Sequence, residues 1–216
     1  MSLGGCTERL SAVHPAGPAA AAIATLWWVL LVGAVAIFVL VMTLLVLAFR
    51  VLGSDAPEAE RALEGRWIIG LGLVFPGTVL AALLAYGLVV GERLLPRAGP
   101  DVVVLHAEAR QWAWRFAYPG MAMDTTDGVL HIPAGRPVDV HITTRDVIHS
   151  FWVPRLAGKL DAIPGHVNVL RLEADAPGDY AGVSAEFSGR GYSGHGFTVT
   201  AHDADAWSAL VAGTEP

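Results

Sequence analysis

Cysteine is nearly absent from this sequence: Cys6 is the only one among 216 residues. A single cysteine excludes an internal disulfide, and it excludes any metal centre within the chain that needs two bridging thiolates. Charged residues are also scarce, at 16%, whereas 54% of the residues are hydrophobic. This balance is too apolar for a soluble protein of this length, so membrane-spanning segments are expected.

Two uncharged runs are long enough to cross the hydrocarbon core of a bilayer, which takes about 20 apolar residues. The first covers residues 20–49 and the second covers residues 67–91. They predict a two-helix transmembrane hairpin within residues 20–97. Pro76 lies inside the second run, where we expect a kink and not an end of the helix, because neighbouring helices can satisfy the freed backbone groups.

The basic residues indicate an orientation in the membrane. The connecting loop, residues 50–66, contains Arg50, Arg61 and Arg66, whereas the external N-terminal segment 1–19 has only Arg9. The positive-inside rule therefore places the loop in the cytoplasm and both termini on the periplasmic side. The net charge of −6 lies in residues 101–216, which argues against nucleic acid as a partner and leaves a basic protein partner open.

Cys6 follows Leu3-Gly4-Gly5, a sequence that resembles the end of a bacterial lipoprotein signal. The charged and apolar parts of such a signal are missing from the residues before it. Two interpretations stay open: lipidation of Cys6 in a chain whose start is truncated, and a chance likeness.

Residues 98–216 change to short alternating patterns separated by Pro-Gly and Gly-rich turns, which predict a periplasmic β-sandwich domain. A short closing helix is expected from Asp203 to Val211, capped by the aspartate. The fold class is thus a membrane-anchored all-β protein. The candidate strands are residues 102–107, 111–118, 129–132, 138–144, 149–153, 167–172, 178–183 and 196–200.

Three segments of this domain contain the functional signal, namely 111–116 (QWAWRF), 146–154 (DVIHSFWVP) and 184–197 (SAEFSGRGYSGHGF). Behind a helical hairpin, in this order, they resemble subunit II of the haem-copper respiratory oxidases. The resemblance implies a periplasmic cupredoxin-like domain on a chain that is anchored in the bacterial inner membrane, with subunits I and III as partners. Haems and copper would reside in the partner subunit. In family members that oxidise cytochrome c, the cupredoxin also holds a dinuclear copper centre.

Six positions match the ligands of that copper centre, and four of them have changed. The matching positions are His149, Ser184, Glu186, Ser188, Tyr192 and His195. Serines replace both cysteines, and a serine hydroxyl is hard and stays protonated near neutral pH, unlike a bridging thiolate. We therefore expect no dinuclear copper and no cofactor in this chain. A mononuclear metal site on His149 and His195, with Glu186 or Tyr192, is the alternative to ordinary hydrogen bonding.

The serine-containing loop is similar to that of the quinol-oxidising branch of the family. It favours a non-redox subunit II of a proton-pumping quinol oxidase, whose catalysis resides in the haem subunit. In a second hypothesis the chain serves a cytochrome c oxidase that lost its copper and takes electrons by another route, with Trp112 as a relic of the electron entrance. A third is a free-standing membrane-anchored cupredoxin-like binding protein. For the pair Trp112 and Trp114, strand packing is the alternative interpretation.

Three more residues are candidates for a function. Glu64 is a possible entrance to a proton path, in a register that Pro76 disturbs. Arg155 and Asp161 are either interface residues toward the haem subunit or members of loop salt bridges.

Overall fold

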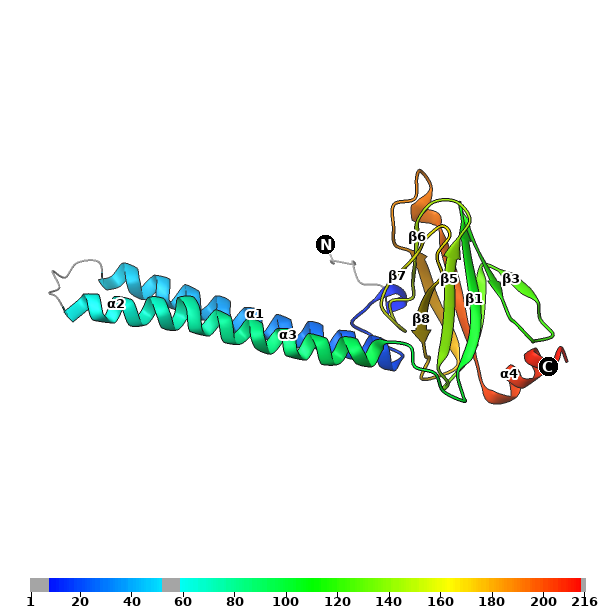
Figure 1. Ribbon diagram of the computed structural model, residues 1–216, viewed down its shortest axis with the longest axis horizontal. Coiled ribbons are helices and arrows are strands. Elements are labelled where there is room, and N and C mark those ends of the chain that lie inside the picture. Colours follow the sequence, from blue (N-terminus) through cyan, green and yellow to red (C-terminus); the bar gives the residue numbers. More distant parts are fainter. Residues whose placement is uncertain (1–7, 52–58, 215–216) are drawn as a thin grey trace. The chain divides into compact units, whose positions relative to one another are not determined.

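The computed structural model describes residues 8–51 and 59–214, so Cys6 and part of the loop between the spans lie outside the described residues. The chain divides into two units: the β domain, Leu95–Pro216 together with the N-terminal segment up to Leu26, and a helical unit, Trp27–Leu94. Figure 1 shows the helices and the strands in chain colours.

Long apolar helices make up the helical unit. The first, α1, is Pro18–Val51, which begins with a proline at the position where its missing N–H costs nothing. The second run consists of α2 (Ala59–Ile69), a π-helical segment (Gly70–Val74) and α3 (Phe75–Leu94). Pro18–Arg50 and Glu64–Leu94 are long and apolar enough to cross a membrane, and their most apolar windows are not buried within the protein.

The second run continues through Pro76 without a break in helical structure. Proline lacks the N–H that would donate to a carbonyl of the preceding helical turn. The π-helical segment ends at Val74, and Pro76 follows two residues later in α3. The helix therefore does not end at Pro76, as the sequence predicted, and the predicted kink stays a prediction.

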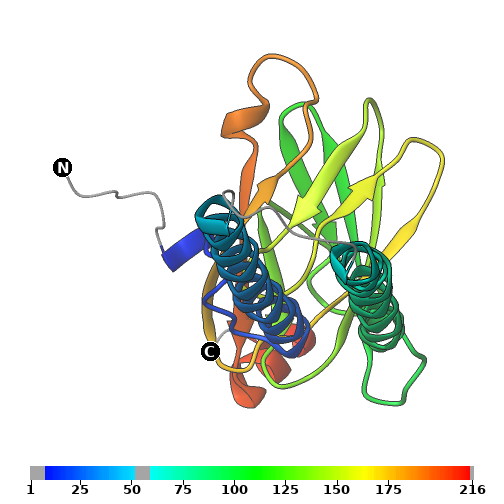
Figure 2. The same ribbon diagram turned by 90° about the vertical axis from the view of Figure 1, so that its left-hand side faces the viewer.

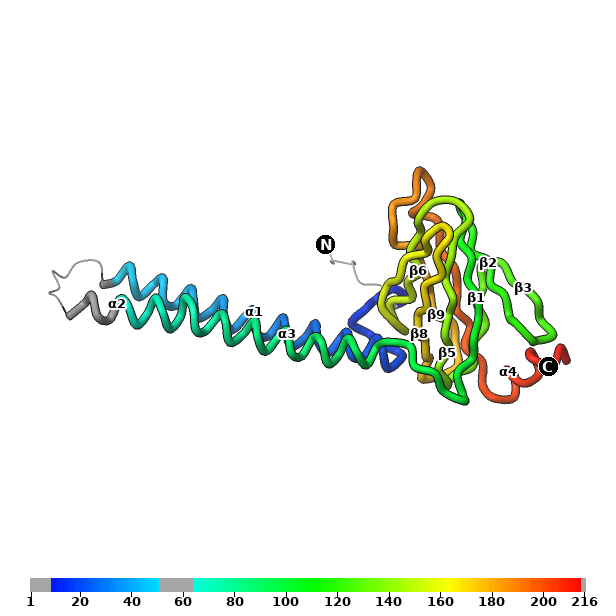
Figure 3. The backbone as a smooth tube through the Cα atoms, in the orientation of Figure 1, coloured from blue at the N-terminus to red at the C-terminus, as the bar shows by residue number. Residues whose placement is uncertain are grey.

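Two five-stranded sheets form the β domain, in the orders β3-β2-β1-β5-β8 and β4-β10-β9-β6-β7. Figure 3 traces the backbone through them. All eight predicted strands are present, and β3 and β7, each of three residues, were missed. The strands are β1 (Val103–Arg110), β2 (Ala113–Ala117), β3 (Thr125–Asp127), β4 (Val129–Pro133), β5 (Val138–Thr144), β6 (His149–Trp152), β7 (Leu160–Ala162), β8 (Asn168–Leu172), β9 (Gly178–Ser184) and β10 (Gly196–His202).

The core lies between the two sheets and is rich in aromatic rings. Trp114 and Phe116 on β2 and Phe151 on β6 are completely buried, and Phe197 on β10 packs against all three. Alternating burial along β1 and β5 is the expected pattern for strands with one face in the core.

Helix α4 (Ala204–Ala212) closes the domain, and the Asp203 side chain caps it by accepting from the Ala206 N–H. This confirms the predicted capping aspartate. Figures 1 and 2 place α4 and the loop after β9 at opposite ends of the β domain.

Residues 8–26, called the N-terminal strap below, pack along the β domain. The Ala16 N–H donates to the Arg155 carbonyl at 2.7 Å, and the Asp175 N–H donates to the Ala16 carbonyl at 2.9 Å. Gly17 is required between them, because a Cβ built there would lie 2.1 Å from the Glu173 carbonyl oxygen. The start of α1 is therefore fixed to the β domain by backbone hydrogen bonds.

Candidate functional site

Four of the six ligand-matching positions are buried at one end of the sandwich. These four, called the buried quartet below, are His149, Ser184, Ser188 and His195. His149 begins β6 and Ser184 ends β9, and these two strands pair with each other. The Ser184 N–H donates to the His195 carbonyl at 2.9 Å, which fixes the return of the loop beside the strand.

The two histidines of the quartet lie against each other. Their ring centroids are 5.0 Å apart, with the planes nearly perpendicular at 85°. Both rings are essentially without solvent exposure, at 0% for His149 and 1% for His195. Trp114 packs against both histidines. Its ring stacks on His195 with centroids 5.6 Å apart, and it meets His149 edge to face with centroids 6.5 Å apart.

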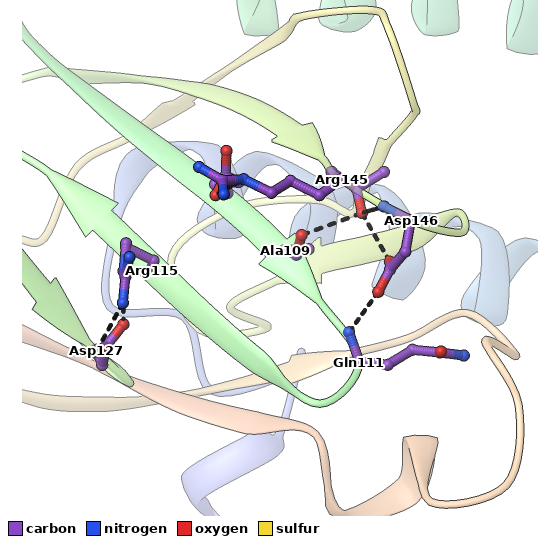
Figure 4. Close-up of polar contacts among 8 residues, drawn as sticks. Ala109, Gln111, Arg115, Asp127, Arg145 and Asp146 are labelled. Atoms are coloured by element: carbon purple, nitrogen blue, oxygen red, sulfur yellow. Dashed lines mark hydrogen bonds and ion pairs between the residues drawn. The ribbon is translucent and has the colours of Figure 1, made fainter.

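A hydrogen-bonded carboxylate orients His149. Asp146 Oδ1 lies 2.8 Å from His149 Nε2, and Asp146 Oδ2 accepts from the Gln111 N–H at 2.7 Å. The Thr144 hydroxyl and the Val147 N–H also bind the carboxylate, and Figure 4 shows its contacts with the turn at Gln111. Burial alone would raise the pKa of Asp146, but these hydrogen bonds lower it to about 2.

Burial has the opposite consequence for His195. It lowers the pKa of the imidazole because the charged form loses solvation, and the neighbouring His149 lowers it further. The Ala113 backbone and Asp146 oppose this shift only in part. His195 is consequently kept neutral near physiological pH.

Several buried polar atoms at this end of the sandwich have no hydrogen-bond partner within the described residues. They are His149 Nδ1, both ring nitrogens of His195, the hydroxyls of Ser184 and Ser188, and Trp114 Nε1. An unsatisfied buried polar group costs roughly 1–3 kcal/mol, so a concentration of six such atoms is unusual.

The other two ligand-matching residues point elsewhere. Glu186 lies toward solvent, where its carboxylate accepts from the Phe187 N–H and approaches Lys159 at 3.9 Å. Tyr192 sits on a short 3₁₀ turn, is 37% exposed, and packs edge to face on Phe187 at 5.3 Å. Among the described residues, no group of three or more His, Cys, Asp or Glu side chains is placed to hold a metal ion.

Trp112 and Trp114 have different environments, although they are two residues apart. Trp114 is fully buried on β2, whereas Trp112 lies in the turn between β1 and β2 with 39% exposure. The Trp112 ring covers Gly189 and Gly191, whose left-handed backbone brings the loop against it, with built Cβ atoms 3.1 and 3.3 Å from the indole. Simple strand packing therefore describes Trp114 and not Trp112.

The remaining predicted residues lie apart from the quartet. Glu64 is exposed on α2. Arg155 donates to the His14 carbonyl at 2.9 Å and lies over the Tyr180 ring, and Asp161 accepts from the Ser150 hydroxyl. Arg155 and Asp161 thus both make contacts within the β domain. For these two residues the sequence left loop salt bridges and an interface with the haem subunit as alternatives.

Sequence reasoning treated the other histidines as ordinary and missed two cross-strand pairs. His131 Nδ1 and His202 Nε2 are 2.8 Å apart on the paired strands β4 and β10, and His106 stacks on His141 at 5.2 Å across β1 and β5. Burial lowers the pKa of His131 and of His106, and in each case the facing histidine lowers it further. Only strand register could reveal these pairs.

Comparisons with known proteins give the family. Residues 120–201 match the family model described as cytochrome c oxidase subunit II, periplasmic domain. Quinol oxidase subunit 2 of Bacillus cereus is 32% identical over 99% of this chain and 77% of its own length. Cytochrome c oxidase subunit 2 of Alkalihalophilus pseudofirmus is 30% identical over 98% of this chain and 64% of its own length.

A solved structure is also similar. The crystal structure of the periplasmic domain of subunit II of cytochrome oxidase from Bradyrhizobium japonicum is 24% identical, with a TM-score of 0.49 over 54% of this chain and 93% of that chain.

The chain belongs to the subunit II family of the haem-copper respiratory oxidases. It is a membrane-anchored subunit of a terminal oxidase complex, and its β domain has the cupredoxin-like fold that the sequence predicted.

Proposed function

We propose that this chain is a non-redox subunit II of a quinol-oxidising terminal oxidase, without the dinuclear copper centre. The observation on which the proposal rests is the burial of Ser184 and Ser188, at 6% and 5% exposure, where copper-bearing relatives have two cysteines. Sequence identity alone does not indicate which electron donor the complex uses, because one similar relative is a quinol oxidase subunit 2 and another is a cytochrome c oxidase subunit 2.

The buried donor set does not fit a thiolate-bridged copper pair. Such a pair needs soft sulfur ligands that deprotonate readily, and the quartet offers two imidazoles and two hydroxyls. Tyr192, at the position of the second histidine, packs on Phe187 instead. No electron-transfer step is therefore assigned to this chain.

In the proposed assembly the β domain faces the periplasm and supports the haem-copper subunit, with subunit III as a further partner. Haems and copper belong to the partner subunit, where oxygen is reduced to water. Quinol dissolves in the bilayer and can reach the partner directly, so an external copper relay is unnecessary. Glu64 remains a proposed entrance to the proton path in this arrangement.

The second candidate, a cytochrome c oxidase that lost its copper, is favoured by one observation. Trp112 is 39% exposed and contacts both the glycine-rich loop and His195, with ring centroids 6.3 Å apart. That is a position from which an exposed ring could meet a protein donor.

Oxygen uptake by the purified complex separates the two candidates. Ubiquinol and reduced cytochrome c would be compared as donors at equal electron concentration. We expect turnover with ubiquinol and none with cytochrome c alone. Rapid turnover on cytochrome c with no response to ubiquinol would establish the second candidate.

A further inference from the structure

We propose that the outer face of the sheet β3-β2-β1-β5-β8 contains a binding site for a phosphate-type dianion, formed by the pair His106 and His141 together with Arg115 and Arg145. The site goes beyond the proposed function. It lies on the solvent side of the sheet and includes none of the positions that match the copper ligands, so it does not depend on the electron donor of the complex.

The outer face of this sheet is hollowed beside the histidine pair. Residues of β1 alternate between the core and the outside, so His106 and Glu108 face outward. In register, His106 lies between Ala117 on β2 and His141 on β5. The short Ala117 side chain leaves space next to the imidazole, and a cavity of about 390 Å³ opens there, lined by both histidines and by Ala117.

The two imidazoles have hydrogen-bonding groups that nothing in the described part of the chain uses. Their rings stack with centroids 5.2 Å apart and planes 18° from parallel. Neither ring makes a hydrogen bond to another described residue, and the same is true of the hydroxyls of Thr125 and Thr143, which also line the cavity. A neutral imidazole has one N–H donor and a protonated imidazole has two. A ligand with several acceptor oxygens would satisfy these groups.

The lining of the cavity is positively charged, although residues 101–216 carry the net charge of −6. Arg115 and Arg145 line it, and among the described residues Glu108 is the only acidic one that does. Glu108 lies 2.6 Å from Arg145. The lining thus has one net positive charge while both histidines are neutral, which favours an anion.

The arginines keep donors for such an anion. Arg115 pairs with Asp127, which lies outside the lining, through Nε and Nη2 (Figure 4). The two side chains of this pair are 41% and 59% exposed, so water screens their attraction. Because a guanidinium has five N–H donors, Arg115 and Arg145 can each bind a further oxygen.

The arrangement of the donors favours a tetrahedral oxyanion. They come from four strands, with His106 on β1, Arg115 on β2, Thr125 on β3 and His141 on β5. A single halide is too small to contact donors on all four strands, whereas the oxygens of phosphate or sulfate point in four directions. Arginine binds such oxygens with charge-assisted hydrogen bonds. Inorganic phosphate and the phosphate group of a small organic molecule share this chemistry.

Binding of a dianion should be coupled to proton uptake by the histidine pair. Burial lowers the pKa of His106, and the facing His141 lowers it further, because two charged rings at this distance repel each other. A dianion beside both rings offsets that repulsion and favours the charged imidazoles. Affinity should therefore rise as the pH falls toward and below 6.5, the ordinary pKa of an imidazole.

Other charged groups around the pair have partners of their own. Asp139 lies two residues before His141 on the outer face of β5, and it accepts from Arg171 on β8 at 2.8 Å. The β8 residue in register with His141 is Val169, which has no charge. Glu108, already paired with Arg145, is consequently the acidic group that an anion must displace or avoid.

The test uses the full-length chain purified in detergent, with sulfate as the first probe because it stays a dianion in this pH range. Calorimetric titration at constant ionic strength measures its affinity at pH 5.5 and at pH 7.5. Coupling to the uptake of one proton should make binding about tenfold tighter at pH 5.5. Inorganic phosphate and glycerol phosphate are then compared at one pH. The tighter of the two shows whether the site takes the free anion or the phosphate group of an organic molecule.

Variants connect the binding to these residues. The double variant His106→Gln/His141→Gln should bind sulfate equally at both pH values, since glutamine keeps an N–H donor but does not titrate. Arg145→Gln should weaken binding about tenfold or more at both pH values, as expected for loss of a charge-assisted hydrogen bond. Arg136→Gln is the matched control for charge. Arg136 donates to the Asp101 carbonyl and does not line the cavity, so its loss should change the affinity by less than about twofold.

Four results would overturn the proposal: no sulfate binding by the wild-type chain at pH 5.5, equal wild-type affinity at the two pH values, retained pH dependence in the double variant, or equal weakening by Arg136→Gln and Arg145→Gln. The wild-type titrations require no variant, so a variant that fails to fold does not remove the test. The donor comparison on the whole complex reports on the proposed function separately, and either result can fail without the other.

Discussion

The side-chain amide of Gln111 donates a 2.6 Å hydrogen bond to the carbonyl of Ser188, joining residues 77 positions apart in the sequence. Gln111 lies in the turn between β1 and β2, and Ser188 lies in the loop that follows β9. This contact positions the loop between β9 and β10, which contains Ser188 and His195.

Replacing Gln111 with alanine should therefore destabilise the β domain. We expect a loss of about 1 kcal/mol in the free energy of unfolding, the usual contribution of a hydrogen bond, since the buried Ser188 carbonyl loses this donor. Urea denaturation of the full chain measures the change. Arg190→Ala, an exposed change in the same loop, is the control and should stay within about 0.5 kcal/mol of wild type. Equal stability of Gln111→Ala and Arg190→Ala would contradict this assignment.

The N-terminal strap depends on Gly17. Gly17→Ala places a Cβ 2.1 Å from a backbone carbonyl oxygen that cannot rotate away, so the strap must separate from residue 173. A loss of roughly 1–3 kcal/mol is expected, as for an overpacked core position. Thermal unfolding followed by circular dichroism measures it. In the matched control, Gly158→Ala, the new Cβ meets only a flexible side-chain carbon at 3.5 Å, and comparable losses in both variants would disprove the steric explanation.

The pH dependence of stability should reveal His131. Burial, and then the facing His202, lower its pKa from the ordinary 6.5, so the unfolded chain binds a proton at a pH where the folded chain does not. Stability associated with His131 is present above pH 6.5 and declines as the pH falls from there toward the lowered value. The urea midpoint at pH 7.5 and at pH 5.5 measures this decline.

His131→Gln supplies the comparison for that titration. Glutamine keeps an oxygen that can accept from His202 but cannot take up a proton in this range. The variant should lose less stability than wild type between the two pH values. An equally steep decline in both proteins would assign the effect to other groups.

Trp112 should be unnecessary for electron transfer if quinol is the donor. Trp112→Phe keeps an aromatic ring over the glycine-rich loop, and we expect ubiquinol-driven oxygen uptake by the complex to stay at the wild-type rate. Trp114→Phe would change the core and serves as the contrasting variant, with a loss of stability. A selective loss of cytochrome c-driven turnover in Trp112→Phe would instead support the second candidate function.

Strand prediction succeeded where alternation was long enough to measure. The eight predicted strands each had at least four residues with a repeating apolar pattern. The missed strands β3 and β7 have three residues each and owe their structure to pairing with β2 and β6. Such edge segments contain too few residues for a periodic signal, and only their pairing with the strand that precedes each of them makes them strands.

The sequence by itself determined the two membrane spans, because the length of an apolar run and the thickness of a bilayer can be compared in one dimension. It also determined that two hydroxyls stand where thiolates would be required, since ligand chemistry follows from residue type. Only the tertiary structure decided that His149 and His195 meet at 5.0 Å while Tyr192 turns to Phe187. Those contacts depend on the pairing of β6 with β9 and on the path of the loop between them, which residue spacing does not encode.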